Sequence, residues 1–553
     1  MPGSETFDTR GNRLPSGLPG TWLTGLATLA VLVMLVVLLW IVAINAFGWF
    51  WPASIWRFEL ADGSIRVGLV VDREEVPPSP ADGASEPRYR LRIKVGNREL
   101  TRADFEWVNE DDIVSRSTPG DLVRVVRSEY GDAFGRIVGA VASNGSEVDV
   151  GPPGALEGFL ETGRRWRHER NRVEAERDRV RRPLTRLEEK LDLVERSAHA
   201  DSAAGKLEIE ALGSKVTETA ARLKPRLDGL EHDLETLDAR LSGSSILLAA
   251  GSDKLEVTLG SVREIVWPNR MGFAARLVHA LREGILFLVT EPREANTEGG
   301  IFPALFGTIL LVLLMSVAVV PLGVVTAVYM TEYARAGLPL RLANQAVNNL
   351  AGVPSIVFGM FGLAFFVYEV GGAVDRALFS DVLPTPTFGT GGVLWASLTL
   401  ALLTVPVVVV ATREGLHAVP GSWREGSLAL GATRWQTLRR IILPAAMPGI
   451  LTGLILAVSR AAGEVAPLML TGAVKLAPSL PVDGTPPFLH LQRKFMHLGF
   501  HIYDVSMQSP NVEAAKPMAF ATTLVLLLLV VLMNLTAIIV RRRLRRAFRG
   551  QVV

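Results

Sequence analysis

Residues 424–450, REGSLALGATRWQTLRRIILPAAMPGI, decide how the rest of the sequence is interpreted. The middle of this segment has helix-forming residues with an apolar stripe, and arginines occupy the other positions. Gly431 interrupts the pattern, and we expect Pro444 and Pro448 to end it before the next apolar run. The segment therefore predicts a pair of short amphipathic helices on a membrane surface. The stripe consists of Leu428, Trp435, Leu438 and Ile442.

Long apolar runs lie on both sides of this segment. Hydrophobic residues make up 49% of the 553 positions, but they are concentrated in these runs. A run of ~20 apolar residues matches the ~30 Å hydrocarbon core of a bilayer, so we expect an all-α polytopic membrane protein with roughly six transmembrane helices. The expected spans are residues 21–47, 303–329, 352–370, 391–411, 448–470 and 518–540.

The first run is expected to be an uncleaved anchor. Its apolar part, residues 23–46, is much longer than the ~7–15 residues of a signal-peptide core. Aromatic residues follow it, where a cleavage site would require small residues, and they suit a membrane-water interface. These aromatic residues are Phe47, Trp49, Phe50 and Trp51.

Basic residues near the membrane predict the topology. RRRLRRAFR, residues 541–549, directly follows the last run, and five arginines lie in residues 412–447, whereas residues 371–392 contain only Arg376. The positive-inside rule therefore predicts a cytoplasmic tail at residues 1–20, a cytoplasmic loop at 412–447 and a basic cytoplasmic tail at 541–553. The net charge of +2 indicates little about partners. The chain has no cysteine, which excludes disulfides and thiolate metal sites, and we expect no metal site.

A large extracytoplasmic α+β insertion is expected at residues 48–272. Alternating apolar and polar residues predict strands within 55–150 and 244–267. Between them, apolar residues at spacings of seven, four and three predict an antiparallel coiled-coil hairpin at 157–242, which Pro183 and Pro225 should disturb locally. No cluster of histidines, paired carboxylates or Gly-rich phosphate loop stands out in the insertion. Two interpretations of the insertion therefore remain open. It either docks an external partner or is a solvated segment without a chemical role.

The residue order in 424–450 resembles the EAA loop of ABC importer permeases. Glu425 is followed six residues later by Gly431. An apolar pair comes next along the chain, and Leu443 and Pro444 follow that pair. Gly426 and Ser427 stand where that family has two alanines, and both are small. The resemblance implies a type I importer core of residues 273–540, in which this loop fits a groove of a cytoplasmic ATPase. It assigns ATPase coupling to Glu425, Gly431, Ala432, Trp435, Leu443 and Pro444.

Three further segments resemble the PstA family of permease subunits of phosphate-specific importers. These are NTEGGIFPALFGT (296–308), AGVPSIVFGMFG (351–362) and SRAAGEVAPLMLTG (459–472). The resemblance covers the first span and the chain from about residue 273, but not the insertion. It implies a bacterial inner-membrane location and as partners a PstC-like permease, a PstB-like ATPase dimer, a PstS-like phosphate-binding protein and inorganic phosphate.

The same resemblance implies a transport subunit and not an enzyme. The phosphate-loop motif G-x-x-x-x-G-K-[ST] does not occur in the sequence. We therefore expect ATP and Mg to be bound by the partner ATPase, and no cofactor by this chain. The membrane lipid is a further expected partner, and nucleic acid is not.

Two charges stand inside the fifth apolar run. At ~1.5 Å per residue from Pro448, Arg460 lies ~18 Å and Glu464 ~24 Å into the membrane. A charge at a helix centre costs at least ~2.5–3.5 kcal/mol, so neither should face lipid, and the spacing of four lets them pair. One hypothesis is a structural ion pair. The other, implied by the resemblance, is that Arg460 and Glu464 line the phosphate path.

Two other functions remain open at this point. The chain could be a permease for another oxyanion such as molybdate or sulfate, because an arginine binds several oxyanions. It could also be a membrane scaffold or sensor that acts through the external coiled coil.

Overall fold

The computed structural model describes residues 18–76, 88–101, 103–128, 130–150, 154–195, 202–251, 253–293, 296, 298–380, 383–484, 487–509 and 512–549. Residues 1–17 of the expected N-terminal tail and residues 550–553 of the expected basic tail lie outside these ranges. Within them, six helical segments are long and apolar enough to cross a membrane, which confirms a helical membrane protein. They are Trp22–Phe50, Phe302–Tyr333, Ser355–Leu378, Val393–His417, Arg434–Ala461 and Ala515–Arg543.

Individual helices and π-helical turns build these segments. The first and last are α1 (Leu18–Phe50) and α16 (Val512–Arg549), and the fourth is α10 (Val393–His417). The second joins α6 (Phe302–Val328) to a π turn at Tyr329–Tyr333, and the third joins α8 (Ser355–Phe361), a π-helical stretch at Gly362–Gly371 and α9 (Gly372–Leu378). The fifth contains α12 (Arg434–Thr437), a π turn at Leu438–Ile442 and α13 (Leu443–Ala461). Shorter helices are α5 (Phe273–Val289), α7 (Leu338–Leu350), α11 (Gly421–Ala429), α14 (Ala466–Thr471) and α15 (Leu498–Tyr503).

The fifth span differs from the expected single helix over residues 448–470. It begins earlier, because the chain stays helical through Pro444 and Pro448 and joins α12 to α13. The π turn at Leu438–Ile442 lies just before Pro444, where the missing proline N–H removes a regular helical hydrogen bond. The span also ends earlier, at Ala461, and α14 is a separate helix.

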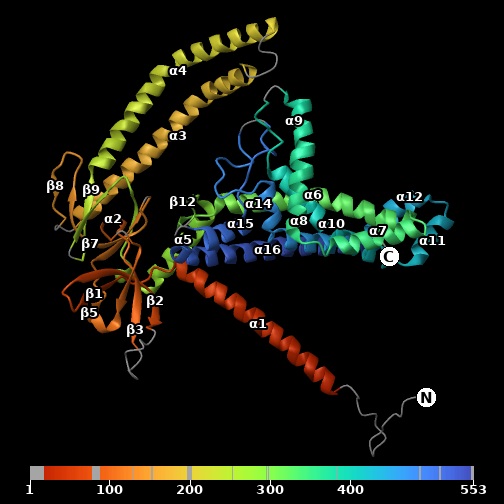
Figure 1. Ribbon diagram of the computed structural model, residues 1–553, viewed down its shortest axis with the longest axis horizontal. Coiled ribbons are helices and arrows are strands. Elements are labelled where there is room, and N and C mark those ends of the chain that lie inside the picture. The colour runs from red at the N-terminus through yellow and green to blue at the C-terminus, as the bar shows by residue number, and fades with distance from the viewer. Residues whose placement is uncertain are drawn as a thin grey trace, which may run out of the picture.

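The membrane core is built around α10, the most buried of the spans. Its apolar residues meet those of α6 and α13 in one buried cluster, which includes Leu311, Leu400 and Ala457. Figure 1 shows α1 diverging from the other membrane helices, and near its C-terminal end α1 meets α16 in a buried cluster that includes Ala46, Ala515 and Met518. Most of α1 is exposed, as expected for a helix that faces lipid or a second membrane subunit.

Glycines let the backbone of α13 pack directly against α10. A Cβ atom at Gly449 would lie 2.6 Å from the Cα of Gly415, and a Cβ atom at Gly453 would lie 2.9 Å from the Cβ of Ala411. Gly449 and Gly453 are one helical turn apart, which is the small-xxx-small spacing typical of close contacts between membrane helices. No larger residue fits there without moving a helix.

Gly449→Ala is therefore expected to destabilise the chain. The added methyl group meets backbone atoms of α10, and overpacking of this kind costs about 1–3 kcal/mol. We expect a lower unfolding temperature in detergent. Gly25→Ala is the matched control, because Gly25 also lies in a membrane helix but has open space around it. Equal unfolding temperatures of the two variants would contradict the close contact.

The β module comprises eleven strands in two antiparallel sheets, with strand orders β4-β3-β2-β1-β5 and β10-β9-β7-β6-β11, and β8 paired to β7. Strand β9 follows the long hairpin in sequence yet pairs with β7, which precedes it. The strands are β1 (Trp56–Leu60), β2 (Ile65–Glu75), β3 (Tyr89–Lys94), β4 (Phe105–Asn109), β5 (Ile113–Ser117), β6 (Leu122–Arg127), β7 (Ala133–Val141), β8 (Glu147–Val148), β9 (Ser245–Ala250), β10 (Asp253–Thr258) and β11 (Val262–Val266).

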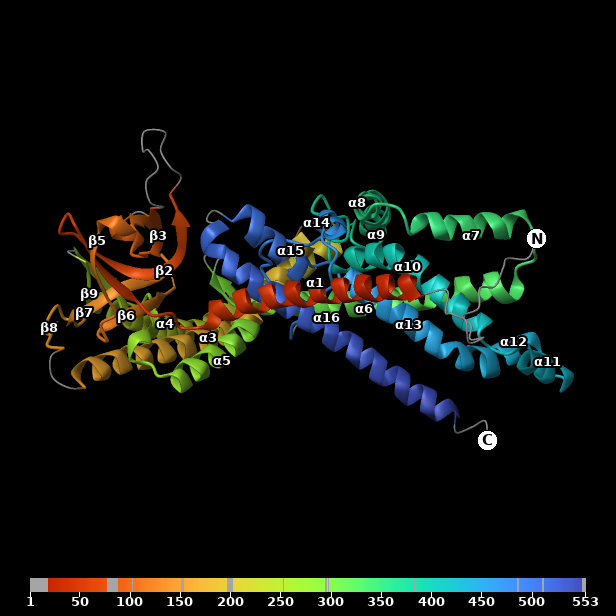
Figure 2. The same cartoon turned by 90° about the horizontal axis from the view of Figure 1, so that it is seen from below.

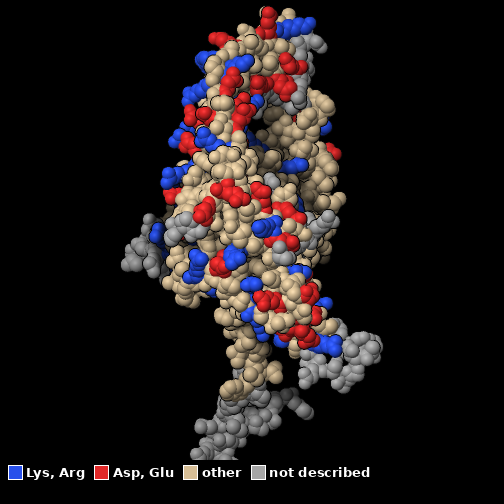
Figure 3. All heavy atoms as spheres, turned by 90° about the vertical axis from the view of Figure 1, so that its left-hand side faces the viewer, with Lys and Arg blue, Asp and Glu red and all other residues tan. Residues whose placement is uncertain are grey.

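Two helices, α3 (Ala155–Glu195) and α4 (Ala203–Gly243), rise from the β module and lie side by side along their length (Figure 1). Val173, Leu234 and Leu237 form part of the buried seam between them. Both helices continue through their prolines, Pro183 and Pro225. The two prolines are exposed, so water can bind the carbonyl groups that they leave unpaired. Figure 3 shows acidic and basic residues intermixed over this hairpin and the β module.

The β module and the α11–α12 pair lie at opposite ends of the long axis of the molecule (Figures 1 and 2). The module is fastened to the start of the membrane core through Asn269, whose side-chain amide donates to the carbonyl oxygens of Ile55 and Pro119. Arg276 of α5 donates to the Pro268 carbonyl and to Ser54. The spans therefore separate two polar ends.

Candidate functional site

The two charges of the fifth span remain together in the structure. The Arg460 Nε and Glu464 Oε1 atoms are 3.4 Å apart. The side chain of Arg460 is 36% exposed and that of Glu464 is 18% exposed. The Arg460 Nε atom is buried and has no hydrogen-bond partner in the part of the chain that the structure describes. The pair therefore leaves donor capacity of the guanidinium unused.

We expected Arg460 and Glu464 to lie on one continuous helix, but the structure has a break between them. Arg460 is in the last turn of α13, whereas Glu464 lies in the turn between α13 and α14. Gly463 favours this break because it has no Cβ, and Pro467 favours it because it cannot donate a hydrogen bond to the carbonyl of Gly463. The chain then restarts as α14, which packs against α8.

Polar side chains hold α13 against α16 just before the break. The hydroxyl of Ser459 and the side-chain amide of Asn534 share hydrogen bonds of 2.8 and 3.0 Å. Two turns closer to the start of α13, Arg541 Nη1 donates to the Thr452 hydroxyl at 2.9 Å. Ala457, Ala461 and Ala462 beside the pair are buried. Arg460 is thus carried by a well-fixed helix end.

A second polar cluster near the helix break was not predicted from the sequence. Lys475 Nζ lies 3.2 Å from Asp504 Oδ1, and the Asn296 amide donates to Asp504 and to the Lys475 carbonyl. Burial lowers the pKa of His497 to about 3 and that of His501 to about 4. Both histidines are therefore neutral near pH 7, so they add no positive charge for an anion. Asn296 is the residue that could have indicated this cluster, because it begins one of the three segments that resemble the PstA family.

The α11–α12 pair and the turn between its helices contain four of the six residues expected to couple to an ATPase. Gly431 turns the chain between the two helices with φ +83°, a left-handed conformation that glycine adopts without strain. Thr433 and Gln436 form a capping box at the start of α12. The Ser427 and Thr437 hydroxyls are 2.9 Å apart and join the two helices. The pair is thus a rigid unit.

Four large apolar side chains are exposed on this pair and the turn between its helices. Leu430 is 91% exposed and Trp435 is 58% exposed, and Trp423 and Leu428 are also exposed. Glu425 of α11 and Gly431 of the turn are also exposed, and Ala432 is half-buried between the two helices. Leu443 and Pro444 begin α13 and are half-buried. Of the expected apolar stripe, only Leu438 and Ile442 face the interior.

The two candidate regions are connected by one helical segment. It runs without interruption from Arg434 to Ala461, so Trp435 is near one end and Arg460 near the other. At ~1.5 Å per residue this segment is about 40 Å long. Arg424 of α11 also pairs with Glu332 at 2.8 Å, which ties the α11–α12 pair to the end of the second span.

Residues 320–546 match the family described as Binding-protein-dependent transport system inner membrane component. The chain is 32% identical over 258 residues to the probable ABC transporter permease protein YqgI of Bacillus subtilis, which covers 45% of this chain and 81% of that protein. It is 33% identical over 252 residues to the phosphate transport system permease protein PstA of Yersinia pestis, covering 46% and 76%.

A third relative is the phosphate transport system permease protein PstA 1 of Mycobacterium tuberculosis. The identity is 39% over 172 residues, covering 31% of this chain and 51% of that protein. This similarity therefore spans about half of the relative's length. Together these comparisons confirm the resemblance to PstA permeases that the three motifs predicted.

Proposed function

This chain belongs to the family of binding-protein-dependent transport system inner membrane components, and from that premise we propose that it is the permease subunit of an ATP-driven importer of inorganic phosphate. It is a multi-pass inner-membrane transport subunit and not itself an enzyme. Relatives named as phosphate permeases support the choice of phosphate. The proposed site is the break between α13 and α14.

The observation that carries this proposal is the partly satisfied guanidinium of Arg460. Its Nε atom is buried without a hydrogen bond among the described residues, although Glu464 is 3.4 Å away. A guanidinium remains ionised and offers a planar fork of donors that matches phosphate oxygens. Glu464 orients it and keeps an anion from binding too tightly to leave, as a conduit requires.

Arg460→Gln is expected to reduce phosphate uptake at least about tenfold, because a neutral amide replaces the charge that meets the anion. Uptake of labelled phosphate by cells that carry the complete transporter measures this, and co-purification of the ATPase checks assembly. Arg376→Gln is the matched control, since Arg376 is exposed and outside the pair. Its uptake should remain normal.

The double variant Arg460→Gln/Glu464→Gln separates the two hypotheses for the pair. A structural ion pair predicts that uptake recovers in the double variant, because no buried charge is left unpaired. The path hypothesis predicts that the double variant stays as impaired as Arg460→Gln alone. Recovery, or normal uptake by Arg460→Gln with intact assembly, would overturn the path role. Uptake of molybdate or sulfate in the same cells tests the other oxyanions.

We further propose that the α11–α12 pair docks onto a cytoplasmic ATPase, which binds ATP and Mg while this chain binds no cofactor. Monomeric soluble surfaces seldom expose several large apolar residues together, and such surfaces mark protein contacts. Leu430, Trp435, Trp423 and Leu428 form such a surface at the polar end of the spans. Glu425, Gly431, Ala432, Leu443 and Pro444 shape and support it.

Leu430→Asp is expected to abolish co-purification of the ATPase and phosphate uptake. Because Leu430 is 91% exposed, the substitution should leave the unfolding temperature unchanged. Leu207→Asp on α4 is the control, since Leu207 is 68% exposed but lies in the hairpin. Retention of the ATPase by Leu430→Asp would exclude this surface as the docking site.

The remaining partners and the topology complete the proposal. We place the α11–α12 pair and both termini in the cytoplasm and the β module outside. The α11–α12 pair and the β module lie at opposite ends of the long axis (Figure 1), which supports this placement of the two. A PstC-like permease would complete the path, two PstB-like ATPases would drive it, and a PstS-like protein would deliver phosphate from outside.

A further inference from the structure

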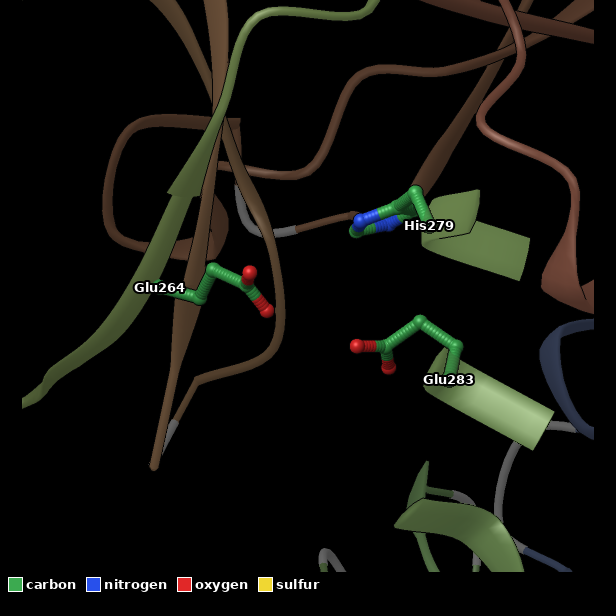
Figure 4. Close-up of side chains that lie close together, drawn as sticks. All are labelled: Glu264, His279 and Glu283. Carbon is green, nitrogen blue, oxygen red and sulfur yellow. The ribbon is translucent and has the colours of Figure 1, made fainter. Parts of the chain in front are cut away.

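Three potential metal ligands meet where the β module joins the membrane core. Figure 4 shows Glu264 on one side and His279 and Glu283 on the other, with their side chains directed toward one another. One ligand atom from each residue lies within 4.8 Å of the other two. The sequence did not indicate this group, because Glu264 belongs to the strand-rich segment and the other two residues belong to the expected permease core.

Local structure explains how the three residues converge. His279 and Glu283 are four residues apart in α5, so they lie on the same helix face one turn apart. Glu264 lies on β11, and the chain turns back between β11 and α5 through Pro268–Arg270. Arg276 and Asn269 fix this turn with several hydrogen bonds to the backbone. The three residues are thus held by two regular elements and a fixed connection.

One carboxylate of the group lacks a partner. Glu283 Oε1 is buried and accepts no hydrogen bond within the described residues. The Glu264 carboxylate is held by Arg282, whose Nη1 lies 2.6 Å from Oε1. Arg282 therefore orients Glu264 from the exposed side and leaves its other oxygen available. Two carboxylates this close repel each other unless a cation lies between them.

We propose that Glu264, His279 and Glu283 bind a divalent transition metal of the Zn²⁺ class. One imidazole with two carboxylates is a ligand set that Zn²⁺ accepts, whereas Mg²⁺ and Ca²⁺ prefer oxygen ligands alone. Bonds of ~2.0–2.2 Å place tetrahedral ligand atoms about 3.4 Å apart. The three atoms reach that spacing by side-chain rotation, since all already lie within 4.8 Å.

The metal would act as a structural clamp between the β module and the membrane core. It would link β11 to α5, the helix that leads into the first span of the permease core. Binding to the folded state alone stabilises that state, so the metal would hold the external module in one orientation over the membrane. Three protein ligands leave a fourth position for water.

Calorimetric titration of Zn²⁺ into the full-length protein tests the proposal, with the protein purified in detergent and stripped with EDTA. We expect one Zn²⁺ per chain and a higher unfolding temperature in its presence. His279→Gln and Glu283→Gln should each weaken binding at least about tenfold, because each removes a ligand. His232→Gln, an exposed histidine of α4, is the matched control and should bind as the native chain does.

Unchanged Zn²⁺ binding in His279→Gln would overturn the proposal, as would preference for Ca²⁺ over Zn²⁺. Arg282→Gln keeps all three ligands and should therefore still bind one Zn²⁺ per chain. If the ligand variants do not fold, X-ray absorption at the zinc edge of the native protein decides. A spectrum that shows one imidazole nitrogen and two carboxylate oxygens from the protein around the zinc supports the site. Any other set of protein ligands excludes it.

Discussion

The backbone contact between α10 and α13 is the constraint on which the membrane core depends. Gly415, Gly449 and Gly453 bring the two helices closer than any side chain would allow. In lipid, helix association relies on such close packing, because hydrocarbon outside the protein is as apolar as leucine. The contact fixes α13 along its length, and α13 in turn carries both the α11–α12 pair and Arg460.

This arrangement makes the fifth span the connection between the two candidate regions. The helical segment from Arg434 to Ala461 is continuous, so it joins α12 to the helix end that bears Arg460. The π turn at Leu438–Ile442 and the two prolines lie near the α12 end, where the segment is least regular. Ser459 and Asn534 hold the other end against α16. Movement is thus more easily absorbed near α12 than near Arg460.

The sequence predicted the elements well and the interruptions poorly. Apolar runs located the six spans because membrane length imposes a strong requirement on composition. The ends of the fifth span could not be predicted, since Pro444 is accommodated by a π turn whose formation depends on packing. Arg460 and Glu464 were found because charges in an apolar run are conspicuous. Glu264, His279 and Glu283 were not, because only the turn after β11 brings them together.

In the phosphate path that we propose, the position of Arg460 at a helix end would let one cation bind the anion without trapping it. The C-terminus of a helix carries partial negative charge, which stabilises a nearby cation by about 0.3–1 kcal/mol when exposed. Arg460 stands in the last turn of α13 and also faces Glu464. In that path, an incoming anion would compete with the Glu464 carboxylate for the same guanidinium. Binding that replaces an existing partner is weaker than binding to an isolated cation, so release of the anion would remain possible.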